Sequence, residues 1–331
     1  MHKHVKKTDF FNIFRYREWL YSKIPFLALP MPVYFLTTGF AGLHQILVCV
    51  QFSAFTALFL GFGYVINDYC DRSADIRAGK KNYLSSLKSP IALMIVVVVA
   101  AIGVLVAFIG HFDFETPILL IIIYFFGMAY SARPFRLKEK GVLGLFASSA
   151  AQRSLPLLLL FSYSNIEMKT ILFWMAFGFF VGMRYILIHQ YIDRDNDKKS
   201  GTNTFASKNA KIFRFLIYGT FAIEAVFVVM VSVLSFGWLV TAIIAAAYTV
   251  YEALSFYAVE KLFHKSFWLS YVSVPFESLY NFYLPMIVLV KLAIVNLQWL
   301  IPLALLCIIM HRAIIAKAEI PKASLRALLK I

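Results

Sequence analysis

Carboxylate and carboxamide side chains crowd the stretch 64–82, at the end of a long apolar run. They are Asn67, Asp68, Asp71 and Asp75. Offsets of three, four and seven residues put the three aspartates on one face if a helix continues through this stretch. Carboxylates crowded on one face repel one another unless cations lie between them. Hard oxygen ligands suit Mg²⁺, which is usually shared with substrate phosphates. We therefore predict a magnesium site here in preference to a solvated acidic helix end.

A second acidic cluster follows another apolar run. Asp193 and Asp197 are four residues apart and share a helical face, whereas Asp195 points away from them. We assign Asp193 and Asp197 to the metal and leave Asp195 as a solvated carboxylate. His189 lies one turn earlier on the same face, where a histidine is either a hydrogen-bonded structural residue or a direct participant. Each of the two acidic clusters follows an apolar run. This shared arrangement predicts a helix bundle that holds a metal–diphosphate between the two clusters.

The composition is that of a polytopic membrane protein. Of the 331 residues, 61% are hydrophobic and only 15% are charged. Several uninterrupted apolar segments have a length of about 20 residues, as a transmembrane helix requires. The first 23 residues are basic and lack the apolar core of a signal peptide. The formal net charge of +15 falls almost entirely between the apolar runs. Topology and anionic headgroups explain it, and nucleic-acid binding is not expected.

We expect an all-α bundle of nine to ten transmembrane helices within residues 24–312. A basic segment 1–23 precedes it, and a basic tail 313–331 follows in the cytoplasm or on the membrane surface. Loops rich in Lys and Arg alternate with loops nearly free of them. This positive-inside pattern predicts that both termini, both aspartate clusters and the loop 132–140 face the cytoplasm. The predicted transmembrane segments are 24–43, 45–66, 90–110, 116–131, 142–162, 170–191, 212–233, 237–258, 276–295 and 298–312.

Some charged residues fall inside these predicted segments, namely Arg153, Arg184, Glu224 and Glu252. A charge at that depth is costly and usually faces an internal cavity. Arg184 precedes Asp193 by nine residues, so it lies about 13 Å deeper along a helix that rises 1.5 Å per residue. We name Arg153, Arg184 and His189 as candidate acceptor-binding residues. An Arg–Glu pair inside the bundle is the structural alternative.

Three motifs carry a resemblance to a known family. The acidic clusters read NDYCDRSAD at 67–75 and DRDNDKKSGTNT at 193–204, and the loop between them reads YSARPFRLK at 130–138. In order and spacing, these segments resemble the motifs of the UbiA superfamily of intramembrane prenyltransferases. The loop departs from the family's Pro-Pro, because Arg133 and Pro134 stand there. A tenth transmembrane segment also exceeds the family's usual nine.

The resemblance implies Mg²⁺-dependent transfer of a prenyl group from its diphosphate to a lipophilic acceptor inside the membrane. It implies that six residues bind the metal, namely Asn67, Asp68, Asp71, Asp75, Asp193 and Asp197, with Asp75 acting directly or through water. Among them, it implies a catalytic role for Asp68, Asp71, Asp193 and Asp197. Arg136 and Lys138 are the expected diphosphate partners by their motif positions, and Arg72 is a further candidate. Such cations and bridging metals neutralise the charge that develops on a departing diphosphate.

Two other functions remain as alternatives. Phosphoribosyl transfer to a polyprenyl phosphate also uses Mg²⁺ and a diphosphate leaving group, but it needs a sugar donor for which we identify no sequence feature. A transporter of cations or phosphates would bind its cargo near the middle of the membrane, whereas these clusters lie at its cytoplasmic boundary. We therefore expect an integral-membrane prenyltransferase with its active site facing the cytoplasm, in the inner membrane if the source is bacterial.

Overall fold

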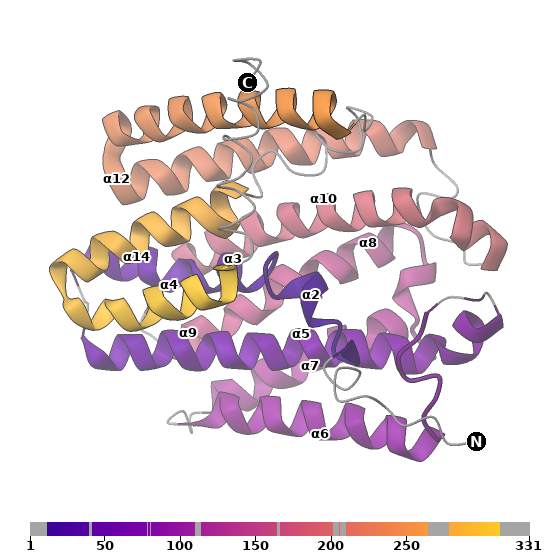
Figure 1. The fold of residues 1–331 in the computed structure, drawn as a ribbon. Coiled ribbons are helices and arrows are strands. Elements are labelled where there is room, and N and C mark those ends of the chain that lie inside the picture. The colour runs from indigo at the N-terminus through magenta and orange to yellow at the C-terminus, as the bar shows by residue number, and fades with distance from the viewer. Residues whose placement is uncertain are drawn as a thin grey trace. The chain divides into compact units, whose positions relative to one another are not determined.

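All regular structure in the described part of the chain is helical, which confirms the predicted all-α class (Figure 1). The computed structural model describes residues 12–39, 42–77, 79, 81–109, 114–163, 166–200, 205, 210–263 and 278–311. Within these ranges it leaves undescribed the side chains of 161–162, 192–200, 210–211, 213–214 and 252–263.

The chain divides into two compact units. The first takes residues up to Leu27 and from Val50 to Phe221, and the second takes Ala28–Cys49 and the residues from Ala222 onward. The domain boundaries that we placed after residues 23 and 312 do not follow this division and stay predictions.

The candidate metal-binding and diphosphate-binding residues within 64–82 and 130–138 all belong to the first unit. Its elements are α2 (Tyr16–Trp19), most of α3 (Ile24–Ala28), most of α5 (Leu43–Arg77), α6 (Ser89–Phe108), α7 (Glu115–Ser131), the 3₁₀ turn η1 (Leu137–Glu139), α8 (Val142–Ser149), the π-helical turn η2 (Ala150–Ser154), the 3₁₀ turn η3 (Leu155–Leu158), α9 (Leu159–Tyr163), α10 (Met168–Ser200) and the start of α12 (Ala210–Phe263).

The second unit contains α4 (Pro30–Thr38), the start of α5, the rest of α12, the π-helical turn η4 (Leu279–Tyr283), α14 (Leu284–Val295) and the 3₁₀ turn η5 (Leu297–Trp299). Helix α4 packs on α14, and the rings of Phe35 and Trp299 lie 6.1 Å apart. Gly237, with a φ of 77°, breaks α12 at the turn predicted between segments 212–233 and 237–258. The ammonium of Lys291 donates to the Ser235 carbonyl at 3.1 Å, which ties α14 to α12.

Among the described residues, four helices are long and apolar enough to cross a membrane: Leu43–Arg77, Ser89–Phe108, Met168–Tyr191 and Phe215–Tyr251. Shorter apolar helices at Ile24–Thr38, Glu115–Ser131, Leu279–Val295 and Leu297–His311 correspond to further predicted segments. The predicted segment 142–162 is not one regular helix, because α8 passes into η2, η3 and α9. Pro156 lies within η3, and proline cannot donate the hydrogen bond that a regular helix needs.

Two glycines one turn apart let α10 pack closely against α8 and η2 (Figure 1). A Cβ added at Gly178 would overlap the carbonyl oxygen of Arg153, and one at Gly182 would lie 2.9 Å from the Cα of Ser149. This small-xxx-small spacing is typical of helices that approach closely in membranes. The contact fixes the position of η2, which carries Arg153.

Gly178→Ala is therefore expected to destabilise the protein by roughly 1–3 kcal/mol, the usual cost of overpacking. The midpoint of thermal unfolding in detergent, followed by tryptophan fluorescence, checks this expectation. Gly219→Ala is the matched control, because nothing lies within 4 Å of a Cβ added there. Equal midpoints for the two variants would show that the close contact does not constrain the packing.

Candidate active site

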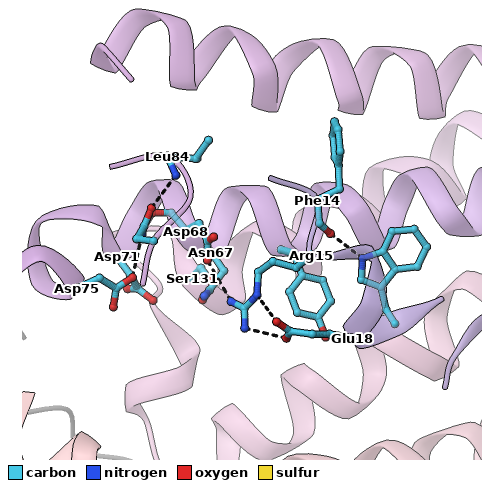
Figure 2. Close-up of polar contacts among 12 residues, drawn as sticks. Phe14, Arg15, Glu18, Asn67, Asp68, Asp71, Asp75, Leu84 and Ser131 are labelled. Atoms are coloured by element: carbon cyan, nitrogen blue, oxygen red, sulfur yellow. Dashed lines mark hydrogen bonds and ion pairs between the residues drawn. The ribbon is translucent and has the colours of Figure 1, made fainter. Parts of the chain in front are cut away.

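Helix α5 presents the first acidic cluster along one face. It is 35 residues long and runs through Arg77, so the condition under which the three aspartates share a face is met. Asn67, Asp68, Asp71 and Asp75 consequently all lie on one rigid element (Figure 2). Each of them contacts a residue from another part of the first unit.

Asp71 lies between two cations from the loop after α7. The Arg136 guanidinium donates to its Oδ1 at 3.1 Å, and the Lys138 ammonium donates to its Oδ2. Lys138 also donates to Oδ1 of Asn67 at 3.0 Å. The hydroxyl of Ser131, the last residue of α7, donates to the same Asn67 oxygen at 2.8 Å. The loop predicted to bind diphosphate is thus held against the first motif by its own two cations.

Asp68 is 2% exposed and is paired with a cation from the N-terminal segment. Nη1 of Arg15 donates to Asp68 Oδ1 at 3.1 Å, while Nε and Nη2 donate to the two oxygens of Glu18, each at 2.7 Å (Figure 2). The backbone of Arg15 is left-handed, with a φ of 48°. Within the described chain, the other Asp68 oxygen, Oδ2, is buried without a hydrogen-bond partner.

Asp75 is oriented by Asn82, which is 5% exposed. The Asn82 amide donates to Asp75 Oδ2 at 2.8 Å and to the backbone carbonyl of Asp68 at 2.7 Å. Its own oxygen accepts from the backbone N–H of Leu84 at 3.0 Å (Figure 2). Asn82 therefore ties the chain after α5 to the last carboxylate of the motif.

Asn82→Ala should increase the Mg²⁺ concentration for half-maximal activity several-fold, because Asp75 loses the donor that orients it. Turnover measured across a magnesium titration tests this expectation. Thermal unfolding, measured in parallel, records any structural loss. A lower unfolding midpoint with an unchanged magnesium dependence would reduce Asn82 to a purely structural residue.

Acidic neighbours keep both site arginines charged. Partial burial lowers the pKa of Arg136, but the hydrogen bond and charge of Glu139, together with Asp71, raise it overall. Burial likewise opposes the charge of Arg15, and Glu18 and Asp68 reverse that effect and raise its pKa. Both guanidiniums are therefore permanent cations beside the carboxylates.

A sequence profile of the UbiA prenyltransferase family matches residues 27–274, well over half of the chain. The chain belongs to the UbiA prenyltransferase family. Its fold is similar to that of a UbiA homologue from Archaeoglobus fulgidus bound to GPP and Mg²⁺, which is 14% identical, with 98% of this chain and 100% of that chain covered and a TM-score of 0.50. The Cd²⁺-bound structure from the same organism is 16% identical, covers 85% and 99%, and gives a TM-score of 0.53. No curated protein sequence matches.

The residues present fit the divalent cation that the family's relatives bind. The buried Asp68 Oδ2 lacks a partner in the described chain, and a buried carboxylate oxygen without one is costly. Carboxylate and carboxamide oxygens are the ligands that Mg²⁺ prefers. Among the described residues, no group of three acidic, histidine or cysteine side chains converges on one point. Further ligands would therefore come from water, from substrate or from the second motif.

Asp193 and Asp197 of the second UbiA motif lie in the helical backbone of α10, and their side chains lie outside the described residues. Of the candidate acceptor-binding residues, Arg153 and Arg184 are buried, whereas His189 is exposed. Arg72 donates to the carbonyl of Ser85 at 3.1 Å and to that of Leu87. It holds the loop before α6.

Sequence reasoning missed four residues that contact the α5 cluster or one of its partners, namely Arg15, Glu18, Asn82 and Ser131. Arg15 has the sequence appearance of an ordinary basic residue of the N-terminal segment. Ser131 lies inside the loop motif, where its position beside Tyr130 was the available signal. Asn82 carried no signal, because its role depends on how the chain turns back after Gly79, which has a φ of 66°.

Proposed function

We propose that this protein is a Mg²⁺-dependent prenyltransferase that moves a prenyl group from a prenyl diphosphate to a lipophilic acceptor. The observation that carries the proposal is the contact of Asn67 and Asp71 with Lys138, a cation 71 and 67 residues further along the chain, respectively. Oxygens that suit a metal and a cation that suits a phosphate therefore lie together, which supports the proposal. The GPP and Mg²⁺ of the Archaeoglobus fulgidus homologue support the choice of donor and metal.

In this mechanism Asn67, Asp68, Asp71 and Asp75, with Asp193 and Asp197 of α10, hold the metal. When bound, Mg²⁺ neutralises charge on the diphosphate. Arg136 and Lys138 bind the diphosphate directly. The bond between the prenyl carbon and the diphosphate oxygen breaks, and the electron pair leaves with that oxygen. The acceptor nucleophile bonds to the prenyl carbon, and its proton passes to the departing diphosphate. Apolar helices exclude water, which would otherwise capture the allylic cation.

The remaining assignments complete this proposal. Arg72 acts by holding the loop 81–88 beside the site, and it becomes a diphosphate ligand only if substrate displaces its carbonyl partners. Arg153, Arg184 and His189 are the proposed acceptor-binding residues. The alternating basic loops of the sequence favour a site at the cytoplasmic boundary, with both termini in the cytoplasm.

Purified protein in detergent tests the proposal directly. It is incubated with radiolabelled geranyl, farnesyl or geranylgeranyl diphosphate and a membrane-lipid extract, with and without Mg²⁺. We expect a radiolabelled lipid that forms only with Mg²⁺, and its isolation identifies the acceptor. Transfer from phosphoribosyl diphosphate instead would establish the sugar-transfer alternative. Transport of phosphate or of a cation into vesicles, without any transfer, would contradict an enzymatic role.

A further inference from the structure

Two cations are buried in the first unit away from the carboxylates of the α5 cluster. Arg153 of η2 is 1% exposed, and Lys23, just before α3, is 5% exposed. Neither forms an ion pair with a carboxylate in the described part of the chain, unlike Arg15, Arg136 and Lys138. Lysine and arginine are almost never fully buried unless they are paired. The Glu18 carboxylate acts on Lys23 only through space, so the burial of both cations without a direct ion pair indicates a place for an anion.

The Arg153 guanidinium uses only part of its hydrogen-bonding capacity. Its Nη2 donates to the carbonyl of Ser22 at 2.7 Å, and its plane lies over the ring of Tyr185, 4.3 Å from the centroid, and near that of Phe26 at 5.5 Å. Its Nη1 is buried without a hydrogen-bond partner in the described chain. An unsatisfied donor on a buried guanidinium costs more than one on a neutral group, so a ligand that accepts from it would be bound strongly.

Lys23 lies beside the same guanidinium. It follows Ser22 in sequence, and its ammonium donates to the side chain of Gln152, the neighbour of Arg153. It also donates to the Tyr64 hydroxyl at 3.1 Å. Burial, followed by the charge of Arg153, lowers the pKa of Lys23 well below its usual value. A bound anion opposes this lowering of the pKa, as the Glu18 carboxylate does, and so favours the protonated, cationic form of Lys23.

The backbone around Arg153 is irregular but closely packed. The π-helical turn η2 places Gln152 and Arg153, and such turns are frequent at functional sites. Gln152 is held by a hydrogen bond to Ser148 at 2.8 Å. Gly178 of α10 lies so close to the Arg153 carbonyl that a Cβ would not fit. The cation is therefore fixed in position before any ligand binds.

Several cations of the first unit contact one face of α5 at successive positions along the helix. Tyr64, Asp68, Asp71 and Asp75 follow at offsets of four, three and four residues, so they share a face of α5. Lys23 contacts this face at Tyr64, Arg15 contacts it at Asp68, and the cations of the 132–140 loop contact it at Asp71. Tyr64 is one turn, or about 6 Å of helix rise, from Asp68. The Lys23 end of this face is thus the end away from the diphosphate-binding loop.

We propose that Arg153 and Lys23 form a binding site for an acidic group, a carboxylate or a phosphate, carried by the acceptor. This rests on the proposed prenyl transfer, because that reaction needs a second substrate close to the donor. Arg153 Nη1 and the Lys23 ammonium bind the oxyanion one turn of α5 from Asp68, and the apolar remainder of the acceptor lies among the aromatic side chains beside Arg153. Arg153 and Lys23 are only 1% and 5% exposed, so the site lies inside the protein, away from the headgroups of bulk lipid.

Hexyl phosphate, hexanoate and hexanol test the site in purified full-length protein in detergent, below their micellar concentrations. The readout is the midpoint of thermal unfolding at increasing ligand concentration. We expect at least one of the two acids to raise the midpoint with saturation, and hexanol to leave it unchanged. Which acid binds more tightly distinguishes a phosphate from a carboxylate on the acceptor. Equal responses to the acids and to hexanol would overturn the proposal.

Arg153→Gln and Lys23→Gln should each weaken binding of the acid at least tenfold. Lys169→Gln should leave it unchanged, since Lys169 is 82% exposed and already paired with Glu167. Arg153→Lys retains the charge and should recover part of the affinity, so it tests the site even if Arg153→Gln does not fold. Unchanged affinity of the acid in Lys23→Gln and Arg153→Lys, when both are folded, would contradict the assignment.

Geranyl diphosphate with Mg²⁺ separates this site from the donor site. Its affinity should stay within twofold of wild type in Lys23→Gln. A loss of geranyl diphosphate binding as large as the loss of acid binding would assign these cations to the diphosphate instead, and would overturn the acceptor proposal. If the wild-type protein binds the acid but neither binds nor transfers geranyl groups, the proposed function fails while the anion site remains.

Discussion

Asp68→Asn is expected to reduce turnover on the order of 10²–10³-fold while the protein stays folded. The substitution keeps the size of the side chain and removes its negative charge. Asp68 Oδ2 is the buried carboxylate oxygen without a partner in the described chain, so it is the atom best suited to a divalent cation. Arg15 retains both hydrogen bonds to Glu18, and we therefore expect little loss of stability.

Metal binding separates this effect from a general defect. Mn²⁺ titrated into detergent-solubilised protein and followed by electron paramagnetic resonance should bind at least tenfold more weakly to Asp68→Asn than to wild type. Glu167→Gln is the control, because that carboxylate is 62% exposed and paired only on the surface. Near-normal turnover of Asp68→Asn with unchanged Mn²⁺ affinity would exclude Asp68 from the metal site.

The helical fold and much of the site follow from local signals in the sequence. Apolar runs of helical length predicted the helices, and the offsets among Asp68, Asp71 and Asp75 place them on one face because α5 continues past the apolar run. The loop motif 130–138 correctly indicated that Arg136 and Lys138 lie near the cluster, because its order and spacing match those of a known family. Each of these predictions depends on neighbours within a few residues or on a motif.

The rest depends on contacts between distant segments, which periodicity does not reveal. Arg15 and Lys23 have the same sequence appearance as any basic residue before a transmembrane helix, yet one pairs with Asp68 and the other bonds to Tyr64. The change from α8 to a π-helical turn is equally hidden, because an apolar run such as 142–162 favours helix of any kind. Arg153 was recognised as a costly charge, but its contacts depend on how closely α10 approaches at Gly178.

Lys138→Met should lower kcat/KM for the prenyl diphosphate by about 10²-fold, because it removes a charge-assisted contact with the leaving group. Lys138 is 9% exposed and bonds to both Asn67 and Asp71, so its ammonium lies beside the proposed metal ligands, where we propose that the diphosphate binds. Methionine keeps most of the volume without the charge. Arg136→Gln should have a smaller effect, since Arg136 is more exposed and also pairs with Glu139.

Comparison of donors tests whether Lys138 acts on the diphosphate. Geranyl, farnesyl and geranylgeranyl diphosphate share that group and differ only in chain length, so the loss in kcat/KM should be the same for all three. A loss that grows or shrinks with chain length would mean that Lys138 affects the prenyl chain instead. Helix α8 packs tightly on the loop, since a Cβ at Gly144 would lie 2.7 Å from the Leu137 carbonyl. We therefore expect the loop to keep its position in Lys138→Met, and an unfolding midpoint close to that of wild type would verify this.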